Sequence, residues 1–163
     1  MARITGRGAF GLDPRYSGFV PVKAANRTLT RAGLGDGYLH WLGIWRKNIE
    51  MGLTTWTEDS NIDYTRSDCH AWGSSPNIEL FRTVLGIDSD APGFTKIRIE
   101  PHLGELTHAS GTIPHPNGKI AVSYQLENGK WNITVNLPSK TSGKFVWKGK
   151  AYPLTAGENR LTL

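Results

Sequence analysis

The spacing of apolar residues predicts helices in the first half of the chain. Residues 38–50 repeat them at helical intervals, which predicts a helix whose buried face is made by Leu39, Leu42, Trp45 and Ile49. A second helix is predicted over residues 78–85, ending at Gly86, with an apolar face made by Ile78, Phe81 and Leu85. A shorter helix is predicted over residues 23–32, and residues 1–22 have neither period and are predicted to be loop or disordered.

Beyond Phe94 the apolar residues alternate with polar ones, which predicts strands instead. Asn128-Gly129 is a strong hairpin signal between two of them. The predicted strands cover residues 96–100, 119–126, 130–137, 143–148, 151–154 and 159–163. The polar Pro- and Gly-containing segment 88–94 separates the two patterns. The sequence therefore predicts a two-part α+β chain, with a helical part over residues 23–90 and an antiparallel β-sandwich over residues 91–163.

The long irregular segment 52–77 is the first candidate for a functional site. Structureless segments of this length inside compact domains are usually functional. Acids and tryptophans lie along it, including Glu58, Asp59, Asp63, Asp68, Trp56 and Trp72. Sugar rings stack on Trp faces and sugar hydroxyls bond to acids, and glycoside hydrolysis uses two carboxyl groups, so the composition suits carbohydrate chemistry. On composition alone, the alternative that these acids are merely solvated is favoured.

The run Asp68-Cys69-His70 invites an interpretation as a nucleophile and its base. Catalytic Cys/His pairs come from distant segments, however, so we expect Cys69 to be a small buried residue at a helix start. Asp68 and His70 are expected to contact substrate or to join a hydrogen-bond network in the loop. The alternative for Trp56 and Trp72 is that both are core residues.

Composition and charge exclude several classes of function. The 163 residues are 38% hydrophobic and 20% charged, as in a globular protein, and contain no apolar run of membrane-spanning length. The net charge of +5 is scattered, without the basic reading element of a nucleic-acid-binding protein. Cys69 is the only cysteine, which excludes an internal disulfide and a Cys-based zinc site. We therefore expect no metal, cofactor, nucleic-acid or membrane partner, and no signal peptide is visible.

One helix pair cannot bury its own apolar face well. Trp41, Trp45 and Trp72 would remain exposed, which implies neighbours from another part of the same protein or from a partner chain.

Three stretches resemble the bacterial α-L-rhamnosidases of glycoside hydrolase family 78. They are RAGLGDGYLHWLGIWRKNIEMGLTTWTE (31–58), RSDCHAWGSSPNIELFRTVLGI (66–87) and APGFTKIRIEPHLGELTHASGTIPHPNGKIAV (91–122). The likeness runs from Lys23 to the C-terminus. It implies a few helices from an (α/α)6 barrel followed by the C-terminal β-sandwich. It also implies inverting hydrolysis of terminal α-L-rhamnose from a glycoside or polysaccharide, and a periplasmic or secreted bacterial parent.

The resemblance also assigns roles to residues of segment 52–77. The family's base glutamate follows a Gly-x-Thr-Thr element, and that position is Glu58; the sugar-contacting histidine corresponds to His70. Trp56 and Trp72 fall where pocket aromatics are expected, with Asp68 supporting them. The family's general acid lies in earlier barrel helices, so we expect the missing N-terminal part of the parent enzyme as a partner and little activity from the chain alone.

Two alternatives to this interpretation remain at the level of the sequence. One is a non-catalytic carbohydrate-binding or structural β-sandwich module, in which the helical part has no role in catalysis. The other is a related enzyme that acts on a different sugar and keeps Glu58 as its base.

Overall fold

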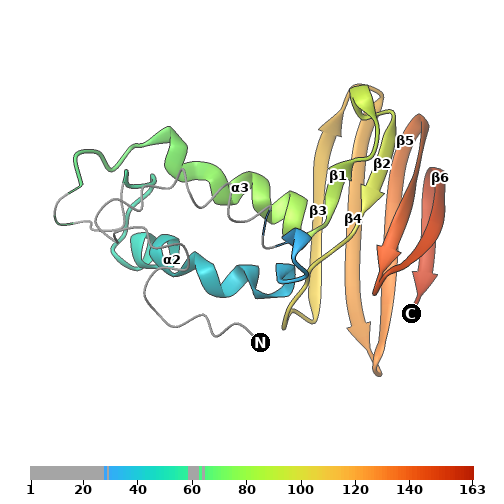
Figure 1. The fold of residues 1–163 in the computed structure, drawn as a ribbon, viewed down its shortest axis with the longest axis horizontal. Coiled ribbons are helices and arrows are strands. Elements are labelled where there is room, and N and C mark those ends of the chain that lie inside the picture. The colour runs from blue at the N-terminus through green and yellow to red at the C-terminus, as the bar shows by residue number, and fades with distance from the viewer. Residues whose placement is uncertain (1–27, 29, 59–62, 64) are drawn as a thin grey trace.

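The computed structural model describes residues 28, 30–58, 63 and 65–163, with the side chain of Trp72 excepted. Short helices lie side by side at one end of the molecule and a curled sheet forms the other end (Figure 1). The helices of the described part are η1 (Gly35–Leu42), α2 (Gly43–Glu50), η3 (Ala71–Ser74), α3 (Ser75–Glu79) and η4 (Leu80–Val84). The predicted order, helices first and strands second, is confirmed. Segment 1–22 and most of the helix predicted over 23–32 lie outside the described residues.

The helix predicted over residues 38–50 forms, but its buried face differs from the prediction. It begins as the 3₁₀-helix η1 and continues as the α-helix α2, so the residues per turn change partway along it. Trp45 is buried as predicted, whereas Ile49 is 63% exposed. Tyr38 and Asn48 lie on the buried side instead.

The second predicted helix also forms with a different inner face. It consists of α3 followed by the π-helical turn η4, which closes with a bond from the amide of Leu85 to the carbonyl oxygen of Leu80 over 3.0 Å. The wider turn changes which side chains face inward. Glu79 and Thr83 are buried, and Ile78, predicted to be buried, is exposed.

The described residues contain one six-stranded sheet. Its strands are β1 (Ile87–Ser89), β2 (Lys96–Ile99), β3 (His108–His115), β4 (Gly118–Glu127), β5 (Lys130–Trp147) and β6 (Lys150–Thr162). A short 3₁₀ turn, η5 (Pro92–Phe94), joins the first two. The order is β1-β2-β5-β4-β3, with β6 also pairing to β5. Among the described strands all pairs are antiparallel except β2 with β5, which is parallel and corrects the purely antiparallel prediction.

Strand β5 is the reason that the sheet curls. Its first half pairs with β4 and its second half pairs with β2, and the register with β6 shifts between Leu137 and Ser142. Such an irregularity bends a strand and increases its twist. Apolar side chains of the sheet pack into one core, which includes Ile97, Ile99, Val122, Tyr124, Ile133, Val135, Phe145 and Leu154.

Two turns fix the register of β4, β5 and β6. The hairpin predicted at Asn128-Gly129 is confirmed, with φ of 51° and 76°. Lys148-Gly149 forms a second turn of this kind, with φ of 48° and 79°. Positive φ at both central residues gives a turn whose twist matches that of the flanking strands. The four strands predicted from residue 130 onward form two long strands, β5 and β6. Strand β3 was not predicted from the sequence.

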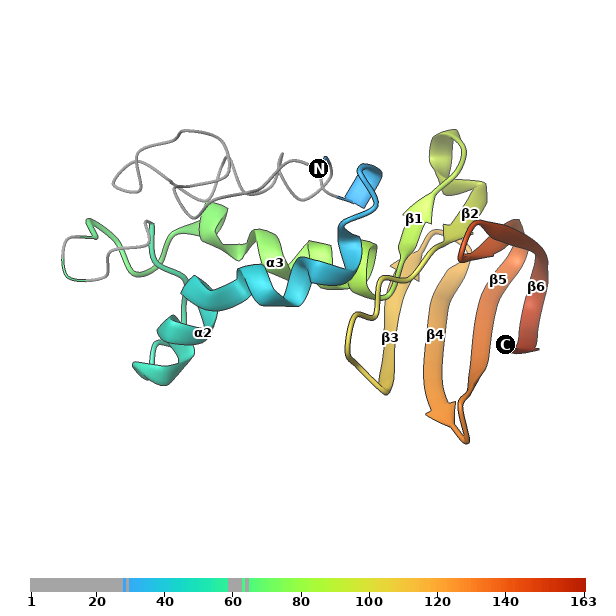
Figure 2. The same ribbon diagram turned by 60° about the horizontal axis from the view of Figure 1, so that its bottom comes forward.

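The helical part and the sheet meet at Gly86. Figure 2 shows η4 leading directly into β1 at the sheet edge. Gly86 has φ of 73°, and β1 begins one residue later and runs into segment 88–94, which was predicted to be a linker. No helix within the described residues is long and apolar enough to cross a membrane.

Candidate functional site

Glu58 forms a bidentate ion pair with Arg66. The Nε atom of Arg66 donates a hydrogen bond to Oε2 of Glu58 over 2.9 Å, and its second guanidinium nitrogen donates to Oε1. The side chain of Glu58 is 21% exposed, whereas that of Arg66 is 82% exposed. The carboxylate is thus held at the edge of the loop by a cation on its solvent side.

Backbone pairing brings the two ends of the loop together. The amide of Glu58 donates to the carbonyl oxygen of Ser67, and the amide of His70 donates to the carbonyl oxygen of Trp56, both over 2.8 Å. The hydroxyl of Thr55 donates to the carbonyl oxygen of Asp68. The residues predicted from the two ends of segment 52–77 therefore lie next to each other on paired backbone.

A buried polar pair anchors this arrangement to helix α2. Thr57 and Asn48 are both fully buried, and their side chains are hydrogen-bonded, with Asn48 Nδ2 3.3 Å from Thr57 Oγ1. Thr57 immediately precedes Glu58, so the bond holds this part of the loop against α2. The sequence analysis missed this pair because two polar residues nine positions apart form no helical or strand pattern.

Trp45 connects helix α2 to η3. Its indole Nε1 donates to the carbonyl oxygen of Gly73 over 2.7 Å, and its side chain is 3% exposed. Trp45 is therefore buried, as the helical pattern predicted, and the separate expectation that it would lack neighbours is wrong, while Trp41 is 37% exposed as expected.

The other predicted site residues are placed as follows. Trp56 and His70 are half-buried, and Asp68 is exposed. Cys69 is also exposed and precedes η3 without being part of it, so the prediction of a buried cysteine at a helix start is wrong. The side chain of Trp72 lies outside the described residues.

Electrostatics favour the ionised form of Glu58. The hydrogen bonds from Arg66 lower the pKa of this carboxyl group most. Burial opposes this as the next largest effect, and the charges of Arg66 and His70 then lower the pKa further. The same contact raises the pKa of Arg66. Nothing in the sequence pattern pointed to Arg66, because its pairing depends on how the loop folds back.

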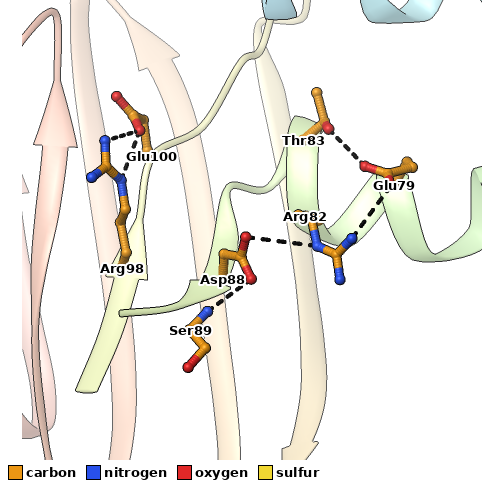
Figure 3. A network of polar contacts seen from close by, with 7 residues as sticks. All are labelled: Glu79, Arg82, Thr83, Asp88, Ser89, Arg98 and Glu100. Carbon is orange, nitrogen blue, oxygen red and sulfur yellow. Dashed lines mark hydrogen bonds and ion pairs between the residues drawn. The ribbon is translucent and has the colours of Figure 1, made fainter. Parts of the chain in front are cut away.

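A second polar cluster lies where the helices meet the sheet (Figure 3). It borders a cavity of about 680 Å³. Buried Glu79 accepts a hydrogen bond from Thr83 over 3.0 Å, and Arg82 lies between Glu79 at 3.5 Å and Asp88 at 3.7 Å. Arg98 pairs with Glu100 beside them. The carboxylates of this cluster each face a cation or a hydroxyl, which suits a structural junction between the two parts.

The sequence of residues 86–161 matches the family described as the bacterial alpha-L-rhamnosidase C-terminal domain. The match begins at Gly86 and includes every strand described above apart from the last residue of β6. The family predicted from the sequence motifs is thereby confirmed.

Individual relatives are also similar to this chain, and the two solved structures below cover more of it than the strand-forming part. An alpha-L-rhamnosidase of Alteromonas sp. (strain LOR) is 36% identical over 68 residues, which is 41% of this chain and 7% of that protein. The GH78 family rhamnosidase of Bacillus sp. GL1 is 30% identical with a TM-score of 0.67, over 74% of this chain and 14% of that one. The Streptomyces avermitilis alpha-L-rhamnosidase complexed with L-rhamnose has a TM-score of 0.77 at 19% identity, over 89% of this chain and 18% of that one.

These similarities support a glycosidase-like origin for residues 86–161 and for the helices before them. The chain spans less than a tenth of its curated relative and less than a fifth of these two solved structures.

Proposed function

We propose that this chain supplies the general base, Glu58, and one wall of the sugar pocket of an inverting α-L-rhamnosidase. The observation that carries the proposal is the position of Glu58, a partly buried, ionised carboxylate on backbone paired with the segment that bears His70. An inverting base must be ionised to accept a proton from the attacking water. The names of the relatives support rhamnose as the sugar removed.

The chemistry needs a second carboxyl group that protonates the leaving oxygen. In inverting enzymes the two groups lie about 6.5–9.5 Å apart, which leaves room for the water. We assign the acid to other parts of a rhamnosidase and expect little activity from this chain alone, because both proton transfer and positioning would be incomplete.

Exposed apolar side chains on the helical part support a partner surface of this kind. Large hydrophobic residues that are exposed here include Leu34, Trp41, Ile49, Met51, Ile78 and Leu80. All belong to the helices and their connections, and none belongs to the described strands. Exposed apolar patches commonly mark interaction sites, so we propose that further barrel helices cover this side.

The proposal is tested by complementation. The full chain is co-expressed with the preceding part of the Bacillus sp. GL1 rhamnosidase, and the purified complex is assayed with p-nitrophenyl α-L-rhamnoside. Proton NMR of the first product should show β-L-rhamnose, the inverted anomer. The matched controls are each polypeptide alone and p-nitrophenyl α-L-fucoside as substrate.

Activity that appears only in the complex, with inverted product, supports the proposal. Initial release of the α anomer would contradict the inverting mechanism. Faster hydrolysis of the fucoside would contradict the assignment of rhamnose and favour a relative that acts on another sugar.

A further inference from the structure

We propose that Arg66 is the positioning residue of the base and fixes the orientation of the Glu58 carboxylate for proton abstraction. The inference rests on the proposed role of Glu58 and adds a residue to which neither the sequence motifs nor the comparisons give a role.

The geometry of the pair carries the inference. Arg66 reaches both carboxylate oxygens, with Nε to Oε2 at 2.9 Å and the second bond from its terminal nitrogen to Oε1. A planar guanidinium that holds two oxygens fixes the plane of the carboxylate, which a single lysine-like point charge does not. Each oxygen retains a further lone pair, so the group can still accept a proton from water.

Both partners are held by the backbone close to the pair. The amide of Glu58 donates to the carbonyl oxygen of Ser67, the residue after Arg66. That same carbonyl oxygen also accepts a bond from the hydroxyl of Thr65, over 2.9 Å. The base and its arginine are therefore linked through one carbonyl group as well as through their side chains.

Folding stability alone does not account for such a pair. Arg66 is 82% exposed, and exposed ion pairs contribute little to stability because water and salt screen them. Orientation of the carboxylate has a large effect on proton transfer, however, because small displacements of catalytic groups strongly change the rate. Variants of Arg66 are accordingly expected to fold.

The first test measures Glu58 itself, in the full chain labelled with ¹³C-glutamate. In Arg66→Gln, the carboxyl resonance of Glu58 should titrate at higher pH than in the wild type, because the hydrogen bonds and charge that lower its pKa are lost. Arg66→Lys should restore part of the difference. Arg46→Gln, a change of an exposed arginine on α2, is the matched control and should leave the titration where it is. Identical titration of Glu58 in wild type and Arg66→Gln would overturn the inference.

The second test uses the complemented enzyme. Arg66→Gln should move the acid limb of kcat/KM to higher pH and lower the plateau of kcat by about 10- to 100-fold, with KM retained. Arg66→Lys should return the acid limb of kcat/KM toward its wild-type pH but restore the plateau of kcat only in part. Lysine supplies the positive charge without the two-pronged guanidinium that binds both oxygens. A change in KM alone, with both limb and plateau retained, would contradict a positioning role.

The two proposals fail separately. If Glu58→Gln were active while Arg66→Gln shifted the titration of Glu58, the base assignment would be wrong and the contact with Arg66 would still be established. If Glu58→Gln were inactive and Arg66→Gln changed neither titration nor acid limb, Glu58 would remain the base and the role of Arg66 would be refuted.

Discussion

The phenolic hydroxyl of Tyr124 donates a hydrogen bond to the backbone carbonyl oxygen of Leu85 over 2.7 Å. Tyr124 lies on strand β4, and Leu85 follows the last turn of η4. Both residues are buried, and the burial raises the pKa of Tyr124 far above its usual value. This bond therefore joins the sheet to the last turn of the helical part. The same helical part carries the candidate site.

We predict that Tyr124→Phe weakens this connection. The substitution leaves the carbonyl oxygen of Leu85 without its partner, and loss of such a bond costs about 1 kcal/mol of the free energy of unfolding. Urea denaturation of the chain measures it. Tyr152→Phe, at a half-buried position on β6, is the control and should change stability by less than about 0.5 kcal/mol. Equal stability of Tyr124→Phe and wild type would contradict the role of the bond.

Gly86 is predicted to tolerate no side chain. It has φ of 73°, and a Cβ atom there would meet the carbonyl carbon of Glu100 at 2.2 Å and the nitrogen of Pro101 at 2.3 Å. Strain of about 1–2 kcal/mol from the left-handed backbone then adds to a clash with backbone that cannot move aside. Gly86→Ala should thus lower the free energy of unfolding by more than about 3 kcal/mol.

Gly149→Ala is the matched control for that substitution. Gly149 has φ of 79° but no atom within 4 Å of its Cβ position. In its alanine variant only the strain of the left-handed backbone should lower the free energy of unfolding, by about 1–2 kcal/mol. Urea denaturation measures both variants. Equal losses of stability at the two positions would show that the close approach of Gly86 to the backbone after strand β2 does not explain its effect.

Tyr38→Phe is predicted to leave stability unchanged or to raise it by about 1 kcal/mol. The Tyr38 hydroxyl is buried and has no hydrogen-bond partner among the described residues, which is costly for a polar group. Burial, and then the negative charge of Glu79, raise the pKa of this hydroxyl well above its usual range. Thermal unfolding measures the effect, and a loss above about 1 kcal/mol would reveal a partner for the hydroxyl.

The pH dependence of stability should include a contribution from Asp90. A hydrogen bond from Lys144, 2.8 Å away, lowers the pKa of Asp90 most, and nearby positive charges add to the effect. Because the folded pKa lies below the unfolded value of about 3.9, the stabilisation is present above that value and is lost as the pH falls through the folded pKa. Lys144→Gln should therefore flatten the decline of Tm on acidification below about pH 4. Lys130→Gln, at an exposed position, should retain the wild-type decline.

Local signals allowed much of the sheet to be predicted. Asn128-Gly129 predicted its hairpin because type I′ geometry requires positive φ at both positions, and the alternating pattern placed the flanking strands correctly. The parallel pairing of β2 with β5 could not be predicted, since it depends on how a long strand bends between Leu137 and Ser142.

The helical part was predicted less well because periodicity assumes a uniform helix. The 3₁₀ and π turns shift the phase of the pattern, which exposes Ile49 and Ile78 and buries Asn48 and Glu79. The candidate site follows the same rule. Glu58 was identified from a motif, but its contact with Arg66 depends on the tertiary path of the loop, which no local pattern encodes.

The role of Glu58 as general base is tested most directly by kcat of Glu58→Gln in the complemented enzyme, with p-nitrophenyl α-L-rhamnoside as substrate. The amide cannot accept the proton from water, so kcat should fall by about 10²- to 10⁴-fold. Glu50→Gln, which changes an exposed glutamate at the end of α2, is the matched control and should retain wild-type kcat. A Glu58→Gln enzyme whose kcat stays within a few-fold of wild type would contradict the account.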